Sequence, residues 1–328
     1  MYRPPFTVSA KAINLIAMIS SQIERYSIKM EQEDTLRLRK VNRIKTIHSS
    51  LAIEGNNLSE SEVQAILEGK KVVAPLKEIQ EVRNAIKTYE LYPKLNPFSI
   101  QDLLQAHGTM MAGLVDEAGV FRSGGVGVFD GVKAIHIAPP ASRVKELMND
   151  LFDWLENTDD HLLIRSCVFH YEFEFIHPFI DGNGRMGRYW QTMLLSRWKG
   201  LFAWLPVETI VKEHQQEYYS VIQKSDKVGE STLFVEFMLR CLLDAMNNYD
   251  VEEESEVQDK VQDKVQDKFP EVLQSTWNVL AILRQNPKST VNDICAQIGL
   301  KERQVYKHIS VRRLFVFNAS AGRNMRFC

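Results

Sequence analysis

Apolar residues recur through the first 250 residues at the i, i+3, i+4 and i+7 spacing of an amphipathic helix. Two clear stripes are Val144, Leu147, Met148, Leu151 and Leu155, and Met186, Tyr189, Trp190, Met193 and Leu194. The alternation that predicts a β-strand is scarce, so the chain is predicted to be mainly α-helical. Residues 121–137 are an exception, because valines and aromatic residues alternate there with glycine before Pro139-Pro140, which predicts a short β-hairpin.

Local signals near the N-terminus place two helix ends. Ser59 and Glu62 have the spacing of a capping box, which predicts that a helix begins at residue 60. Leu58 and Val63 are placed as the hydrophobic staple that accompanies such a box. Just before them, Gly55 is typical of the residue that stops a helix, so an earlier helix is predicted to end there.

The chain changes composition after residue 249. Residues 250–268 turn acidic and then repeat VQDK three times, with one apolar residue in each repeat. That pattern is typical of a linker, whether a frayed helix or a solvated tether. We therefore predict four parts: an N-terminal helical region at 1–100, a central core at 101–249, the linker at 250–270 and a small domain at 271–328.

Composition limits the classes of protein to consider. With 328 residues and 45% hydrophobic content, the chain is long enough to bury a substantial core. No apolar run approaches the roughly 18 to 20 residues that span a bilayer, and no cleavage site follows the first apolar stretch, so we expect no membrane span and a cytoplasmic location. The cysteines form no CxxC pair, which argues against a zinc site or a disulfide framework: Cys167, Cys241, Cys295 and Cys328.

The residues that can carry chemistry lie in one segment, HPFIDGNGRMGR at 177–188. Proline after His177 disfavours helical geometry at the histidine, so one helix is predicted to end there and another to begin near Gly184. Gly182 and Gly184 allow successive backbone N–H groups to converge, and the N-terminus of the second helix adds its positive dipole end. The segment is therefore predicted to be an anion-binding loop.

Charged side chains around this loop indicate which anion binds. Arg185 and Arg188 share a helical face, and with Asp181 as their one neighbouring acid they would repel each other unless an anion were present. Asp181 suits a Mg²⁺ ion shared with phosphate oxygens. His177, with an ordinary pKa of about 6.5, can accept a proton from a hydroxyl near neutral pH. Each residue alone also fits a structural role, but together they favour phosphoryl or nucleotidyl transfer.

The segment resembles the Fic signature HxFx(D/E)GNGRxxR and matches all eight of its specified positions. The similarity extends to Phe121-Arg122, to HIAPPA at 136–141 and to the N-terminal helices, so that it covers roughly residues 1–245. It implies a Fic-type helical core in which the hairpin is a flap. It also implies an enzyme that transfers AMP from ATP to a Tyr, Thr or Ser hydroxyl of a protein, itself included.

The resemblance assigns the catalytic loop residue by residue. His177 would be the base that deprotonates the target hydroxyl, and Asp181 would hold Mg²⁺. Asn183, together with the amides of Gly182 and Gly184, would bind the α-phosphate. Pyrophosphate would be the leaving group.

The remaining assignments concern the phosphates and the target. Arg185 and Arg188 would take the β- and γ-phosphates, and Phe179 would anchor the loop in the core. An extended target segment would pair with the flap by β-augmentation. The flap residues expected to do so are Gly124, Gly125, Val126, Gly127 and Val128.

Residues 50–56, SLAIEGN, are similar to the Fic inhibitory motif (S/T)xxxE(G/N), with Ser50 and Glu54 at its specified positions. A glutamate in a last helical turn faces the negative end of the dipole, at a cost of a few tenths to about 1 kcal/mol, which indicates a partner elsewhere. The resemblance implies that Glu54 pairs with Arg188 and forces ATP into a non-productive pose. In some relatives this glutamate is thought to assist hydrolytic removal of AMP, and the sequence leaves that role open.

Residues 289–301 have the helix, glycine turn, helix pattern of a helix-turn-helix, and residues 271–328 resemble the winged-helix modules of many Fic proteins. Nine Lys or Arg against three acidic residues make this segment basic, although the whole chain carries −2. The wing after residue 315 is short, so DNA, a protein partner and a dimer contact all stay open. The candidate DNA contacts are Arg303, Gln304, Lys307, Arg312 and Arg313.

Three hypotheses for the function follow. The first is a protein adenylyltransferase that uses ATP and Mg²⁺, inhibited by Glu54. The second is a regulator that senses a nucleotide and binds DNA, although a sensor would have no need of His177. The third is a Fic enzyme that transfers UMP, phosphate or phosphocholine, or that removes AMP. The target protein, its modified residue and a homo-oligomeric state are not encoded in these motifs.

Overall fold

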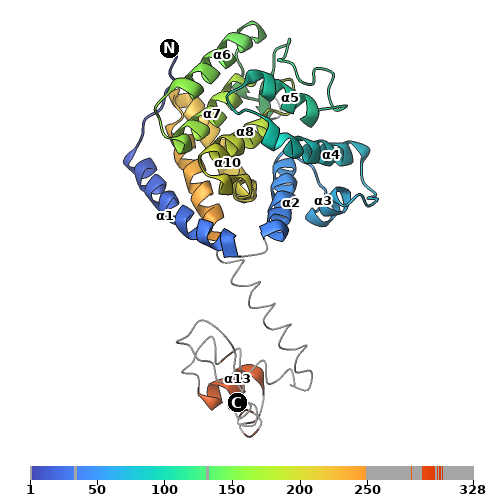
Figure 1. Cartoon of the computed structure of the whole chain (residues 1–328), viewed down its shortest axis with the longest axis vertical. Coiled ribbons are helices and arrows are strands. Elements are labelled where there is room, and N and C mark those ends of the chain that lie inside the picture. The colour runs from blue at the N-terminus through green and yellow to red at the C-terminus, as the bar shows by residue number, and fades with distance from the viewer. Residues whose placement is uncertain are drawn as a thin grey trace. The chain divides into compact units, whose positions relative to one another are not determined.

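The structure is a computed structural model that describes residues 2–32, 35–130, 133–248 and 290–299, with residues 282, 301, 303 and 305. The chain divides into two compact units, Met1–Asp250 and Val251–Cys328. Helices build nearly all of the larger unit (Figure 1), which confirms the mainly α-helical prediction. Among the described helices, none has the length and apolar character that a membrane span requires.

In the described part of the larger unit, the helices are α1 to α10, two 3₁₀ turns and a helix at residues 232–248. Its elements before the hairpin are α1 (Ala10–Gln32), α2 (Thr35–Ile53), α3 (Glu60–Leu67), α4 (Leu76–Leu91), η1 (Tyr92–Lys94) and α5 (Ile100–Met110). Its elements after the hairpin are α6 (Ala141–Asn157), α7 (Leu162–Ile176), α8 (Asn183–Trp198), η2 (Gly200–Ala203), α9 (Val207–Glu213) and α10 (Gln215–Val228).

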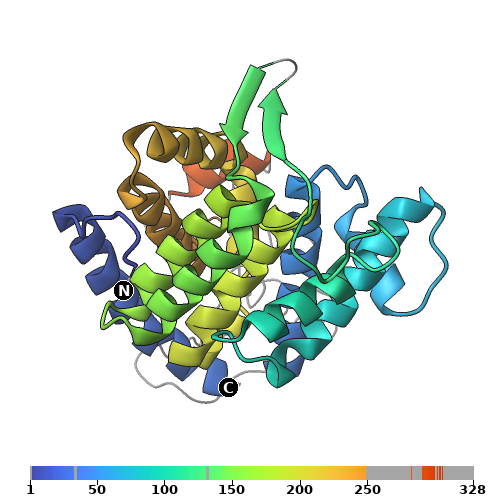
Figure 2. The same cartoon turned by 90° about the horizontal axis from the view of Figure 1, so that it is seen from above.

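Helices α7 and α8 pack against each other at the centre of this unit, with the other helices around them (Figure 2). Most of α7 is buried, because apolar residues surround the helix instead of forming one stripe. The predicted α8 stripe of Met186, Tyr189, Trp190, Met193 and Leu194 is buried in the same core. The loop from His177 to Gly182 therefore begins and ends on two helices that the core holds in place.

The local signals near the N-terminus are confirmed. Ser59 caps α3 with a complete capping box to Glu62, and the staple residues Leu58 and Val63 are both buried. At the end of α2, Gly55 has a φ of 89°, its N–H donates to Ala52 O, and the N–H of Asn56 donates to Leu51 O. This pair of hydrogen bonds is a Schellman motif, which needs a left-handed residue where glycine stands.

Within residues 121–137, β1 (Gly127–Asp130) and β2 (Lys133–Ile137) pair antiparallel. Gly127 lies opposite Ile137 and Val128 opposite His136, and the register shifts between Val128 and Phe129. The two strands extend beyond the helices (Figure 2). Arg122, at the base of the hairpin, contacts the loop after α7.

In the smaller unit the structure describes α13 (Val291–Ile298) and a few flanking residues. Thr290 caps this helix with a capping box to Asp293, and Gly299 ends it with a φ of 67°. Ile294 and Val305 are buried together, with apolar neighbours around them. A helix followed by a glycine turn is therefore present where the sequence predicts it, whereas the winged-helix assignment stays a prediction.

Several predicted features lie outside the described residues. They are the linker at 250–270, the wing after residue 315, and the candidate DNA contacts Gln304, Lys307, Arg312 and Arg313. Of the five candidate contacts, Arg303 is described, and it is exposed.

Candidate active site

His177 ends α7 in a left-handed conformation, with φ 49° and ψ 61°. Among the described residues it is the one non-glycine residue with a positive φ, a conformation that costs a residue with a Cβ roughly 1 to 2 kcal/mol. The N–H of His177 still donates to Phe173 O, so the turn is tied to the helix. Proline at 178 explains the stop, and the prediction that one helix ends at His177 is confirmed.

The orientation of the imidazole follows from its contact with α7. Nδ1 lies 3.3 Å from the carbonyl oxygen of Glu174. A carbonyl can only accept, so in the neutral ring Nδ1 carries the proton and Nε2 carries the lone pair. The nitrogen that can take up a proton is therefore Nε2.

Asn183 closes the loop that follows. Its Oδ1 accepts from the N–H of Phe179 and its Nδ2 donates to the carbonyl of Phe179, both at 2.9 Å. Both residues are buried, Phe179 completely. The Asn183 side chain is thus engaged within the loop, whereas the resemblance implied that it contacts the α-phosphate.

The two glycines beside Asn183 stand where a side chain has no room. Gly182 has a φ of 84°, and a Cβ on it would lie 2.7 Å from the sulfur of Met111. A Cβ on Gly184 would collide with the carboxylate of Glu54 and lie 3.0 Å from a terminal nitrogen of Arg188. Without side chains at these positions, the first turn of α8 lets an anion approach its backbone closely, as the carboxylate of Glu54 does at Gly184. The first N–H groups of α8 have no partners within the helix.

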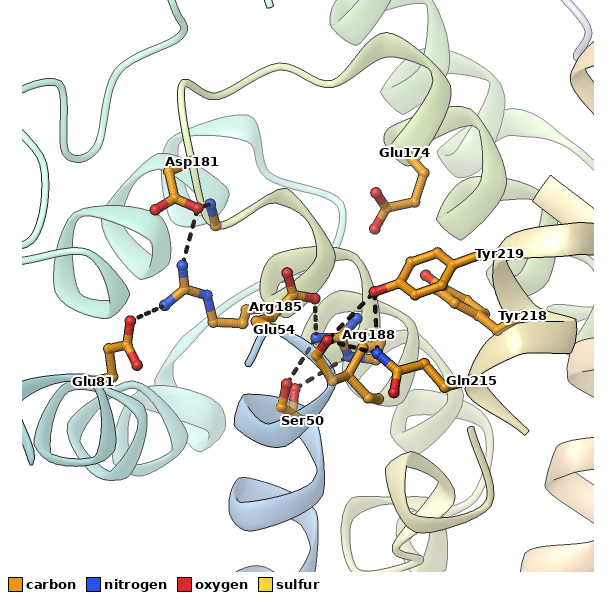
Figure 3. Close-up of polar contacts among 12 residues, drawn as sticks. Ser50, Glu54, Glu81, Glu174, Asp181, Arg185, Arg188, Gln215, Tyr218 and Tyr219 are labelled. Atoms are coloured by element: carbon orange, nitrogen blue, oxygen red, sulfur yellow. Dashed lines mark hydrogen bonds and ion pairs between the residues drawn. The ribbon is translucent and has the colours of Figure 1, made fainter. Parts of the chain in front are cut away.

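Arg185 projects from α8 between two carboxylates. Its side chain is 4% exposed, and its terminal nitrogens lie 3.1 Å from Asp181 Oδ1 and 3.7 Å from Glu81 Oε1 (Figure 3). Asp181 also accepts from the N–H of Gly182 at 2.6 Å, while its side chain stays 50% exposed. The expectation that Asp181 is the only acid near the arginines is wrong, because α4 brings Glu81 to the same place.

Arg188 is held by the end of α2. Its Nη2 donates to Glu54 Oε1 at 2.7 Å and to the carbonyl of Ser50 at 2.9 Å, and its Nε donates to the hydroxyl of Ser50 at 3.2 Å (Figure 3). Burial alone would lower the pKa of Arg188, but Glu54, Tyr218 and Glu174 together outweigh it and raise that pKa. The other terminal nitrogen of Arg188, Nη1, is buried and has no hydrogen-bond partner among the described residues.

Helix α10 fixes the end of α2. Gln215 Nε2 donates to the carbonyl of Ile53 at 2.9 Å, and the hydroxyl of Tyr219 donates to the same oxygen at 3.4 Å (Figure 3). That carbonyl precedes Glu54 directly, so both contacts act on the residue that holds the carboxylate. Nothing in the local sequence around Gln215 or Tyr219 marks this role.

Arg122 joins the base of the hairpin to the loop after α7. Its buried guanidinium donates to the carbonyls of Gly124 and Pro139 on the hairpin side, and to those of Ile176 and His177 on the loop side. Its backbone N–H donates to the carbonyl of the residue after His177. The similarity to Fic proteins includes Phe121-Arg122, but the sequence does not show which contacts the side chain of Arg122 makes.

The flap residues before β1 are accessible. Gly124 and Gly125 are exposed, a Cβ on either would meet no atom within 4 Å, and Val126 is half-buried. Gly127 and Val128 begin β1. The structure thus places all five flap residues in one continuous segment that Arg122 attaches to the loop of His177.

No group of three or more His, Cys, Asp or Glu side chains that could hold a metal occurs in the described part of the chain. A magnesium ion that is shared with phosphates needs only one or two carboxylates. The half-exposed carboxylate of Asp181, next to the first turn of α8, is of that kind.

Comparison with known proteins shows the family to which this chain belongs. A family model described as Fic/DOC family matches residues 97–195. The crystal structure of a Fic family protein from Desulfovibrio desulfuricans G20 is 41% identical, covers 99% of this chain and 100% of that chain, and has a TM-score of 0.73. The chain therefore belongs to the Fic family.

Curated relatives carry a more specific name. Proteins called protein adenylyltransferase Fic are 30% identical in Nematostella vectensis and 31% identical in Aedes aegypti, over 62% and 63% of this chain. The matches cover 48% and 41% of those proteins, so the chain spans less than half the length of either relative. Fic-1 from C. elegans, at 22% identity and a TM-score of 0.62, shares the fold.

Proposed function

We propose that this chain is a protein adenylyltransferase, which transfers AMP from ATP to the hydroxyl of a protein side chain. The names of the curated relatives support the class of reaction. The observation that carries the proposal is the position of His177. Its left-handed turn stands at one end of a loop whose other end is the N-terminus of α8, and Arg185 and Arg188 of that helix are buried.

The chemistry requires one proton transfer and one exchange of bonds. The target hydroxyl oxygen attacks the α-phosphorus of ATP while Nε2 of His177 takes the hydroxyl proton. A P–O bond forms to the target, the bond between the α-phosphorus and the bridging oxygen to the β-phosphorus breaks, and pyrophosphate leaves. Mg²⁺, held by Asp181 and the phosphates, would neutralise the charge that develops on the leaving group.

The first turn of α8 supplies the phosphate contacts. Its N–H groups lie at the positive end of the helix dipole, where an α-phosphate gains both hydrogen bonds and charge stabilisation. Arg185 would contact the β-phosphate while Asp181 and Glu81 hold its guanidinium in place. Arg188 would contact the γ-phosphate, for which Nη1 has no other partner among the described residues.

The hairpin would receive the target. A two-stranded sheet leaves each strand with an outer edge that can pair with an extended peptide. Arg122 fixes the base of this sheet to the carbonyl of His177, so a peptide bound along residues 124–128 would present its hydroxyl beside the imidazole.

Glu54 would inhibit this reaction. Its carboxylate lies against Gly184 in the first turn of α8 and is bonded to Arg188, a position suited to an anion. A carboxylate and a γ-phosphate repel each other and compete for the same guanidinium. ATP would therefore bind in a non-productive pose until Glu54 moves away.

A second reaction is favoured by the same contact. Glu54 is a carboxylate 31% exposed at the phosphate-binding turn, where it can orient a water molecule toward an AMP-modified hydroxyl. Hydrolytic removal of AMP is thus the second candidate function. The smaller unit would bind DNA or protein through the second helix that the sequence predicts after Gly299, for which the capped α13 and exposed Arg303 are the supporting observations.

The test compares wild type, Glu54→Gly and the double variant Glu54→Gly with His177→Ala, each with Mg²⁺ and ATP labelled at the α-phosphorus. We expect protein-bound label to be strongest for Glu54→Gly and absent for the double variant. Equal labelling of both variants would remove His177 as the base. A parallel set of reactions uses ATP labelled at the γ-phosphorus. No label from the α-phosphorus with any folded variant, whether or not the γ-phosphorus is transferred, would overturn the adenylyltransferase assignment.

A further inference from the structure

His107 lies on α5, is fully buried, and contacts the catalytic loop twice. Its ring stacks on the ring of Phe179, with centroids 3.6 Å apart and planes 4° apart. Its Nε2 lies 3.0 Å from the carbonyl oxygen of Asp181. One side chain outside the signature thus contacts both the anchor of the loop and the residue next to Gly182.

The hydrogen bonds of His107 define which nitrogen carries the proton. The N–H of Gly119 donates to Nδ1 at 2.9 Å, so Nδ1 must be the acceptor. The proton of the neutral ring is then on Nε2, which donates to the carbonyl of Asp181. A protonated ring would carry a hydrogen on Nδ1 and could not accept from Gly119, so the neutral form is the one that this geometry requires.

Gly119 reaches His107 because it has no side chain. Its φ is 81°, and a Cβ on it would lie 3.1 Å from the carbonyl of Leu104 and 3.2 Å from Cα of Gly108. The turn that contains Gly119 therefore lies directly on α5, with its N–H aimed at the imidazole. The hydrogen bond from Gly119 therefore fixes the orientation of the His107 ring independently of the catalytic loop.

The contact with Asp181 matters because of the peptide that joins Asp181 to Gly182. A peptide unit is planar, so the direction of the Asp181 carbonyl also fixes the direction of the Gly182 N–H. Glycine tolerates positive and negative φ about equally, so this peptide can flip at Gly182 with little steric cost. The hydrogen bond from His107 opposes such a flip.

We propose that His107 is a positioning residue for the nucleotide: it locks the Asp181–Gly182 peptide, and with it the direction of the Gly182 amide and the Asp181 carboxylate, in the orientation that binds ATP with Mg²⁺. This inference rests on the proposed function. Because the Gly182 N–H donates to Asp181 Oδ1 at 2.6 Å, a flipped peptide would release the carboxylate as well. His107 thereby acts on the position of the carboxylate proposed to hold Mg²⁺ without touching the metal or the nucleotide.

Two amide substitutions distinguish the hydrogen bond that His107 donates to Asp181 from the one that it accepts from Gly119. The amide of glutamine reaches the position of Nε2 and can donate to Asp181, whereas the shorter amide of asparagine reaches only the position of Nδ1 and can accept from Gly119. His107→Phe keeps the stacking on Phe179 and removes both hydrogen bonds. All three are made in the Glu54→Gly background, where the phosphate-binding turn is open.

The measurement is the Kd for ATP with Mg²⁺ by isothermal titration calorimetry, alongside thermal unfolding. We expect His107→Gln to bind ATP within about threefold of its parent, and His107→Asn and His107→Phe to bind at least about tenfold more weakly, since a buried carbonyl loses its donor. The Gln and Asn variants both carry an amide, so the comparison of their Kd values tests the inference even where His107→Phe does not fold.

The outcomes separate the two proposals. Equal Kd values for the Asn, Phe and Gln variants, with lower Tm values for the first two, would make His107 merely structural and overturn the inference. A parent that binds no ATP would instead overturn the proposed function, and the role of His107 with it.

Discussion

The guanidinium of Arg122 donates to the carbonyl of His177 at 2.7 Å, and the same side chain binds the hairpin through Gly124 and Pro139. The element proposed to hold the target and the residue proposed to deprotonate it therefore share one buried cation. Their relative position depends on a planar fork whose donors reach several carbonyls at once.

Arg122→Lys tests that dependence. A lysine keeps the charge, but its single nitrogen cannot span carbonyls on both sides, so we expect the kcat for AMP transfer in the Glu54→Gly background to fall about 10- to 100-fold with little change in KM for ATP. The readout is steady-state transfer from labelled ATP. Arg143→Lys is the matched control, because Arg143 is exposed and lies 3.6 Å from Glu146. Equal kcat values for the two lysine variants would refute the role of Arg122.

Gln215→Ala tests whether α10 sets the strength of inhibition. The substitution removes the hydrogen bond to Ile53 and leaves Glu54 and Arg188 untouched. A neutral hydrogen bond contributes about 1 kcal/mol, so we expect basal AMP transfer to rise roughly fivefold. In the Glu54→Gly background, Gln215→Ala should add nothing, because the contact that it loosens no longer exists. A further rise in that background would show that Gln215 acts on catalysis directly.

The local features of this site could be predicted from the sequence because local chemistry produces them. Proline at 178 stops α7 by steric clash with the residue before it. Ser59 begins α3 and Gly55 ends α2 through hydrogen bonds to residues a few positions away. The assignment of the signature and of the Glu54–Arg188 pair came from resemblance, because no local rule states which cation a glutamate meets.

The supporting residues could not be predicted in this way. Glu81, His107 and Gln215 lie on α4, α5 and α10, and each contacts the site only because its helix packs beside α8 or α2. Their positions in an amphipathic pattern are those of ordinary helix residues. The signature does point to Asn183, but it does not reveal that the side chain of Asn183 closes the loop by hydrogen bonds to Phe179.

Gly187→Ala should destabilise the packing of α7 on α8. A Cβ at this position would lie 2.8 Å from the buried ring of His170 and 2.9 Å from Glu174 Oε1. Hydrogen bonds to Gln191 and Tyr218 hold that ring in place, so it cannot move aside easily. The overpacking outweighs the gain in helix propensity, and we expect a net loss of about 1 to 2 kcal/mol in the free energy of unfolding.

Urea denaturation of Gly187→Ala and of Gly200→Ala checks this expectation. Gly200 has nothing within 4 Å of an added Cβ, so its substitution should leave the unfolding midpoint nearly unchanged. The two variants carry the same chemical change, and a similar midpoint for both would show that α7 and α8 tolerate a methyl group between them.

Glu208 on α9 should make stability depend on pH. It is 2% exposed, one of its oxygens has no hydrogen-bond partner among the described residues, and burial raises its pKa from 4.5 to about 7, with Arg188 and Thr192 acting in the opposite direction. Because the folded state holds this proton more tightly than the unfolded chain does, the stabilising contribution is complete below about pH 4.5 and is lost as the pH rises through about 7.

Glu208→Gln removes this ionisation and keeps the shape of the side chain. We expect the variant to gain stability relative to wild type as the pH rises from 5 to 8, by up to about 3 kcal/mol in the free energy of unfolding. Burial also raises the pKa of Glu172 to about 7, so wild-type stability has a second contribution in the same range. The informative quantity is accordingly the difference between variant and wild type, measured by urea denaturation at each pH. A difference that stays constant from pH 5 to 8 would mean that Glu208 is already ionised in the folded protein, held by the positive charge of Arg188.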